Sequence, residues 1–150
     1  MEIKVALFLP RDAASVPVTR QLLDCCLERL GVMPDTRADI ALALSEACAN
    51  VIQHAGPGQE YEVVASTRDG RCVIEVVDTG SRETGAQRAP DEADEATLLS
   101  ERGRGLRIID AVTDQMSMTG NGPAGTTVHF EKILDWEPGA LAEQLPVAGT

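Results

Sequence analysis

The chain has 150 residues and a formal net charge of −11, from 24 acidic and 13 basic side chains. A chain of this length is long enough to bury a core and is expected to fold as one domain. The acidic balance argues against direct binding of DNA or RNA, which needs a basic surface, and suits a protein partner with a basic patch. No run of about 18 apolar residues occurs, so no membrane-spanning helix is predicted.

The first elements follow from apolar periodicity. Alternation over residues 3–9 predicts a strand with one apolar face. A helix is expected from about 15 to 30, with Ser15 as its N-cap and Gly31 after its end. A second helix is expected from about 34 to 55 and is apolar nearly all the way round. This pattern predicts that the second helix packs on more than one side.

Glu46 and Asn50 interrupt the apolar surface of this second helix. They are four residues apart, so their side chains lie one above the other on the same face. Burying a carboxylate and an amide costs free energy unless a partner meets them. Backbone groups could be that partner, and so could a bound cation or a polar ligand.

The rest of the chain alternates between short strands, a helix and one long linking segment. We expect strands at about 60–67, 71–78, 114–119 and 125–134, and a helix at about 103–112. Asp69 and Gly70 would form a hairpin turn. Residues 80–102 have no apolar periodicity and are expected to be either a mobile lid or a plain surface loop. The elements predict an α/β (α+β) two-layer sandwich, a mixed and mainly antiparallel sheet with helices on one face.

Four cysteines occur, at positions that follow the apolar pattern: Cys25, Cys26, Cys48 and Cys72. Their spacing fits neither a zinc site nor a redox pair. We therefore expect buried, reduced thiols and a cytoplasmic protein.

Three further motifs follow Glu46 and Asn50 in a fixed order. Asp78-Thr-Gly80 ends a predicted strand, Gly103-Arg-Gly-Leu106 opens a predicted helix, and Gly125-Thr-Thr127 leads into the last strand. Each is common when taken alone, as a turn, a flexible helix entry or a loop end. Their order and their structural context carry the functional signal.

This ordered set, from about Leu9 to Phe130, resembles the superfamily of gyrase, heat-shock chaperone ATPases, histidine kinases and mismatch-repair ATPases, with its Bergerat-type ATP-binding fold. Within it, Ser45–Ala55 and Gly103–Val112 look like two motifs of the anti-sigma-factor serine/threonine kinases of bacteria. One departure is Arg82, where family members often have a second glycine, and it bears on the lid more than on nucleotide binding. The resemblance implies one ATP-binding domain at 1–134, with the lid at 80–102, and a tail at 135–150.

The resemblance also implies roles for residues around the nucleotide base and the metal. Asp78 would accept a hydrogen bond from the adenine amine, and Gly80 would let the backbone approach the base. Asn50 would ligate Mg²⁺ through its amide oxygen. Thr126 would close the site with its hydroxyl. Glu46 would be the general base.

The remaining roles concern the phosphates. Gly103, Gly105 and Leu106 belong to the helix start, whose backbone N–H groups would bind the phosphates of ATP. Arg104 would either neutralise charge on the γ-phosphate or be a solvated residue.

The function that the resemblance implies is an ATP- and Mg²⁺-dependent protein serine/threonine kinase. It would act as an anti-sigma factor, phosphorylate a small antagonist protein, and regulate transcription by switching partners, without touching nucleic acid or membrane. The partners would be the antagonist and a sigma factor, and a homodimer is suggested. The alternatives are a non-catalytic ATP-gated binding module, an ATPase if water is the attacking group, and a structural domain without ligand. The intact Glu46 favours the kinase.

Overall fold

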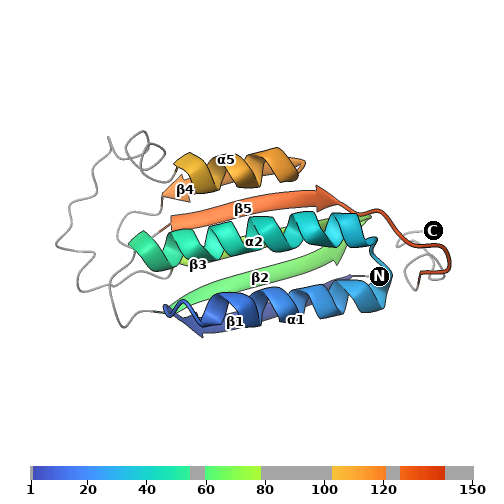
Figure 1. Ribbon diagram of the computed structural model, residues 1–150, viewed down its shortest axis with the longest axis horizontal. Coiled ribbons are helices and arrows are strands. Elements are labelled where there is room, and N and C mark those ends of the chain that lie inside the picture. The colour runs from blue at the N-terminus through green and yellow to red at the C-terminus, as the bar shows by residue number, and fades with distance from the viewer. Residues whose placement is uncertain (1, 55–59, 79–102, 121–125, 141–150) are drawn as a thin grey trace.

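Five strands form one sheet in the computed structural model, and three helices cover one face of that sheet (Figure 1). The structure describes residues 2–54, 60–78, 103–120 and 126–140. This is the two-layer α/β sandwich that the sequence predicts. The predicted lid at 80–102 and Gly80 lie outside the described residues.

Each predicted helix and strand is present, with its ends shifted by at most one residue. The helices are α1 (Ser15–Leu30), α2 (Pro34–His54) and α5 (Gly103–Val112). The strands are β1 (Ile3–Pro10), β2 (Glu60–Arg68), β3 (Arg71–Asp78), β4 (Gln115–Gly120) and β5 (Thr126–Ile133). No helix in these described ranges is both long and apolar enough to cross a lipid bilayer.

The strands lie in the order β1-β2-β3-β5-β4, and every pairing between the described strands is antiparallel. β2 and β3 form the predicted hairpin, with φ of 54° at Asp69 and 77° at Gly70, as its two-residue turn requires. β5 enters between β3 and β4. Its register pairs Val77 with Thr127, which brings the start of β5 to the end of β3.

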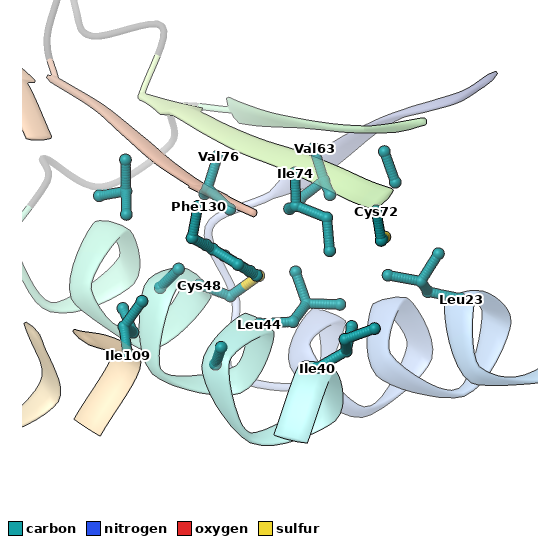
Figure 2. Packing of buried hydrophobic residues seen from close by; sticks show 14 of the residues in the cluster. Leu23, Ile40, Leu44, Cys48, Val63, Cys72, Ile74, Val76, Ile109 and Phe130 are labelled. Atoms are coloured by element: carbon teal, nitrogen blue, oxygen red, sulfur yellow. The ribbon is translucent and has the colours of Figure 1, made fainter. Parts of the chain in front are cut away.

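The core lies between the sheet and the helices. Side chains of α2, among them Ile40, Leu44 and Cys48, point toward Ile74 and Phe130 of the sheet (Figure 2). The core is mainly aliphatic, as expected from a chain with few aromatic residues. The largest of its fully buried side chains are Tyr61 and Phe130.

The cysteines divide into two classes, and the prediction that all four are buried is wrong. Cys48 and Cys72 are buried, and burial raises the pKa of each thiol to about 12, so both stay protonated. Cys25 and Cys26 are exposed. The reason is the orientation of α1, whose buried stripe consists of Ser15, Thr19, Leu23, Leu27 and Leu30. Apolar residues cover a wider part of the surface of α1 than the stripe that packs against the sheet and α2. Cys25 and Cys26 lie outside that stripe.

Two further details of the helices differ from the prediction. The N-cap of α1 is Ala14, whereas Ser15 is its first helical residue. The Ser15 hydroxyl donates to the Asp12 carbonyl and lies 2.6 Å from the Tyr61 hydroxyl, so this serine joins the helix to the sheet. In α2, Leu42 is 43% exposed, because it lies on the outer side, away from the sheet. α2 nevertheless packs on three sides, against the sheet, α1 and α5.

The segment after β5 returns to the junction between α1 and α2. Trp136 pairs with Val32 in an isolated β-bridge. The Met33 N–H donates to the Asp135 carbonyl, and the Glu137 N–H donates to the Gly31 carbonyl. Residues 134–140 therefore close the end of the sandwich at which α2 begins.

Candidate functional site

The sequence motifs gather at the end of the sandwich where α2 finishes. The last turns of α2, the start of α5, the end of β3 and the start of β5 meet there (Figure 1). These elements are far apart in the sequence. The antiparallel register of β3 and β5 and the packing of α5 on α2 bring them together.

Glu46, Asn50 and Gly105 lie in direct contact range. A methyl group built on the Cα of Gly105 would be 3.1 Å from Glu46 Oε1, 3.4 Å from Asn50 Oδ1 and 3.5 Å from Asn50 Nδ2. Any larger residue at 105 would crowd both side chains. The glycine therefore lets the start of α5 approach the two polar groups of α2 closely.

Asn50 is a buried polar side chain with unused hydrogen-bonding capacity. It is 5% exposed, and its Nδ2 has no hydrogen-bond partner among the described residues. An unpaired buried amide costs free energy, so it calls for a ligand, an ion or a water molecule. The sequence left open that backbone groups are the partners of Glu46 and Asn50. Within the described residues, no backbone group pairs with Asn50 Nδ2.

The start of α5 offers backbone donors beside these side chains. α5 begins at Gly103, and the first N–H groups of a helix have no partner within the helix. Leu106 and Ile109 are buried, so they fix the helix against the core. Arg104 is exposed. The helix start is thus rigidly held, with its N–H groups and its positive dipole end at the same place as Glu46 and Asn50.

Asp78 is the last residue of β3, and its side chain lies on the helix-covered face. It shares that face with the buried residues Cys72, Ile74 and Val76, as the sequence predicts. Its side chain is 13% exposed. Its cross-strand partner in β2 is Tyr61, which is completely buried.

Asp78 forms an ion pair with Arg11, a residue that sequence reasoning missed. Arg11 follows β1, and its side chain is only 3% exposed. Burial lowers the pKa of the Arg11 guanidinium, because desolvation disfavours its charged form. No sequence signal links residue 11 to residue 78. The link requires the strand order β1-β2-β3, in which one strand, β2, separates β1 from the strand that ends at Asp78.

Tyr61 is a second residue that sequence reasoning missed. Burial, together with Cys48, raises its pKa to about 12, so its hydroxyl stays protonated. That hydroxyl lies 2.6 Å from Ser15 Oγ. Tyr61 therefore closes the core directly beside Asp78. The sequence signal that could have found it is that it is the single tyrosine of a chain poor in aromatic residues.

Thr126 begins β5 and shares the helix-covered face with Val128 and Phe130 by strand alternation. It is half-buried, at the same end of the sheet as Asp78. The structure thus brings Glu46, Asn50 and Gly105 into contact range, and it puts Asp78 and Thr126 on neighbouring strands. Arg104 is exposed, which is compatible with both readings of this residue, a contact to the γ-phosphate and a solvated side chain.

The residues present fit a nucleotide and a cation with oxygen ligands. Asn50 Nδ2, which is unpaired among the described residues, and the first N–H groups of α5, which have no partner within the helix, are donors that a phosphate chain would use. The close approach at Gly105 brings these groups together, and the amide oxygen of Asn50 is the kind of ligand that a cation would use.

Comparison with known proteins finds relatives along most of the chain. The chain is 28% identical to the serine-protein kinase RsbW of Bacillus velezensis, over 86% of this chain and 84% of that protein. It is 29% identical to RsbW of Bacillus pumilus, over 86% of this chain and 85% of that protein.

Two solved structures share the fold. One contains the RsbU and RsbW domains of Rv1364c from Mycobacterium tuberculosis, with a TM-score of 0.66 and 20% identity. That match covers 88% of this chain, which spans about a third (32%) of that one. The other is the SiaB-SiaC complex from Pseudomonas aeruginosa, with a TM-score of 0.54 and 15% identity over 86% of this chain and 88% of that one.

The family model described as the histidine kinase-like ATPase domain matches residues 9–132. This range contains both helices of the site and the residues Asp78 and Thr126. The chain therefore belongs to the histidine kinase-like ATPase domain family.

Proposed function

We propose that this protein is an ATP-dependent serine/threonine kinase that acts as an anti-sigma factor and phosphorylates a small antagonist protein. The observation that carries the proposal is the meeting of Glu46 and Asn50 with the start of α5 at Gly105. It puts a carboxylate, an amide and the first backbone donors of a helix around one point. The relatives that are named serine-protein kinases support the same activity.

The binding roles follow from the chemistry of each group. Asp78 would accept a hydrogen bond from the exocyclic amine of adenine, and Gly80 would leave room for the base. The N–H groups from Gly103 to Leu106 would donate to the phosphates, and Thr126 would add its hydroxyl at the floor of the site. Arg104, which is exposed, would meet the γ-phosphate.

Asn50 would hold Mg²⁺ through its amide oxygen, and the ion would neutralise charge on the phosphates when bound. One protein ligand suffices, because Mg²⁺ keeps several waters and phosphate oxygens in its coordination sphere.

Glu46 would act as the general base in phosphoryl transfer. The serine or threonine hydroxyl of the antagonist attacks the γ-phosphorus, its proton passes to Glu46, and the bond from phosphorus to the β–γ bridging oxygen breaks to release ADP. Glu46 is half-buried one turn from Asn50, so its carboxylate is within the same site and still open to an incoming hydroxyl.

The charge of the chain fits a protein partner. With a net charge of −11, the chain would attract a basic face of the antagonist or of a sigma factor, and salt would screen this attraction. Such a protein would work in the cytoplasm, where its four cysteines, all free thiols, stay reduced. The family resemblance also implies a homodimer, which sedimentation of the purified chain would test.

The test is incubation of the chain with labelled ATP, Mg²⁺ and candidate antagonist proteins, followed by mass spectrometry. We expect phosphate on a serine or threonine of the antagonist, and complexes that depend on ATP and weaken as salt rises. Phosphate on a histidine of this chain, or only free phosphate, would contradict the kinase. ATP-dependent complexes without any transfer would instead indicate a nucleotide-gated binding module.

A further inference from the structure

The ion pair between Arg11 and Asp78 lies at the end of the site that would receive the base. The guanidinium reaches Asp78 Oδ1 from the link between β1 and α1, on the helix-covered face of the sheet. Both partners are shielded from water, with side-chain exposures of 3% for Arg11 and 13% for Asp78.

Arg11 is buried beside Asp78 and does not extend into solvent. Moving a guanidinium out of this position would break a desolvated charge pair and leave an uncompensated buried carboxylate, which is strongly unfavourable. A ligand that reaches Asp78 therefore meets a carboxylate that is already paired with Arg11.

The protonation state of such a carboxylate decides which base it can recognise. An ionised carboxylate only accepts hydrogen bonds, whereas a protonated one also donates. Adenine presents an amino group at its six position, and guanine presents a carbonyl oxygen there. An adjacent cation favours the ionised form, and burial without a cation favours the neutral form.

We propose that Arg11 is a positioning residue that determines base selectivity through Asp78. It keeps Asp78 ionised and orients it, so that the Asp78 carboxylate accepts a hydrogen bond from the adenine amino group and rejects the guanine carbonyl. This inference rests on the proposed function, in which Asp78 meets the base.

The buried tyrosine and thiol beside Asp78 do not titrate in the range of the test. Among the described residues, Tyr61 faces it from β2, and Cys48 of α2 contacts Tyr61; burial raises the pKa of both to about 12. Thr126 on β5 has no titratable group, and Arg104 on α5 is exposed. In the neutral Arg11 variants, burial without the adjacent cation would favour the neutral form of Asp78, so the test covers about pH 5.5 to 8.5.

The experiment measures ATP and GTP affinity by calorimetric titration across that pH range. Arg11→Met and Arg11→Gln remove the charge, and Gln keeps much of the size and hydrogen bonding should Met fail to fold. Arg11→Lys keeps the charge, and Arg68→Met, at an exposed position away from the site, is the matched control.

The parent and Arg68→Met should prefer ATP, with affinities that change little with pH. Arg11→Met and Arg11→Gln should lose about tenfold or more in ATP affinity, bring the ATP/GTP ratio toward one, and bind ATP more tightly as pH rises. Arg11→Lys should restore the ratio. Neutral variants with the parent ratio and a flat pH profile would overturn the role of Arg11.

A failure of the proposed function gives a different result. If the parent binds ATP but Asp78→Asn binds it equally well, Asp78 does not meet the base, and both the base contact and the role of Arg11 are overturned. If Asp78→Asn weakens ATP binding and the neutral Arg11 variants do not change selectivity, only the role of Arg11 is overturned.

Discussion

The two ends of α2 differ in whether their polar side chains have partners within the described chain. At its first turns, Arg37 Nη1 lies 3.1 Å from both carboxylate oxygens of Asp24, and its Nε donates to the Val32 carbonyl at 3.2 Å. Asp39 accepts from Lys132 Nζ at 3.0 Å. At the other end, Asn50 is buried with an unpaired Nδ2 among the described residues.

The polar groups at the first end stabilise the fold by pairing within the chain. The buried amide at the other end keeps hydrogen-bonding capacity that a ligand could use. The ion pairs at the first end join α2 to α1 and to β5, so their partners are all within the chain. The buried amide at the last end has capacity that the described chain does not use. Substitutions at the two ends should therefore affect different measurements.

The largest effect should come from Glu46→Gln. The amide cannot take the hydroxyl proton, so phosphate transfer to the antagonist should fall by about 10²–10⁴-fold, while ATP affinity and thermal stability stay near those of the parent. Single-turnover kinetics measures the phosphate transfer, and calorimetric titration measures the ATP affinity. Glu28→Gln, at an exposed position on α1, is the control and should transfer at the parent rate. Parent-rate transfer by Glu46→Gln would exclude Glu46 as the base.

Asn50→Ala should weaken ATP binding by about tenfold or more when Mg²⁺ is present, because it removes the proposed metal ligand. With EDTA in place of Mg²⁺, parent and variant should differ little. Without nucleotide, the free energy of unfolding of Asn50→Ala should not show the decrease that the loss of a hydrogen bond causes. The reason is that Asn50 Nδ2 makes no hydrogen bond within the described chain. Equal affinities with Mg²⁺ would remove Asn50 from the metal site.

Arg37→Met should show the reverse behaviour. It removes the pair with Asp24 and the bond to the Val32 carbonyl, so the free energy of unfolding should fall by about 1–2 kcal/mol, a value reduced for the partial exposure of Asp24. ATP affinity of the folded protein should be unchanged. Urea denaturation monitored by circular dichroism, with titration below the transition, checks both. A large loss of ATP affinity would show that the two ends of α2 are coupled.

The smallest effect concerns His129, on the sheet face opposite the helices and away from both ends of α2. Its ring nitrogens lie 3.1 Å from Glu75 and 2.9 Å from Glu131. Desolvation lowers its pKa, but the hydrogen bonds and charges of the two carboxylates outweigh this and leave it raised.

Because the folded-state pKa of His129 is raised, its stabilising contribution is complete below the ordinary histidine pKa of about 6.5 and is lost as pH rises through the folded value. The free energy of unfolding should therefore fall by less than about 1 kcal/mol between pH 6 and 8. His129→Gln should flatten this slope, and ATP affinity should not respond. A steeper slope in the variant would contradict the assignment.

Local sequence signals were sufficient for the elements and for the strand face on which Asp78 lies. Gly31 and the Asp69–Gly70 turn mark chain reversals that only a few residues allow, so the element ends were predictable. The alternation in β3 correctly put Asp78 on the helix-covered face. These features depend on neighbours in sequence.

What the sequence could not supply are contacts that depend on strand order and on helix rotation. The Arg11–Asp78 pair exists because β1, β2 and β3 lie side by side, and no local pattern encodes that order. The exposure of Cys25 and Cys26 depends on which of several apolar stripes of α1 meets the core. Such choices are decided by tertiary packing.

The insertion of β5 between β3 and β4 has a consequence for synthesis of the protein. The ribosome must release β5 before β3 gains its second neighbour, because β5 is the last of the described strands in sequence and an inner strand of the sheet. Thr126 reaches the side of Asp78 only at that step. Nucleotide can therefore not assist early folding of the nascent chain, and it stabilises only molecules whose sheet is already complete.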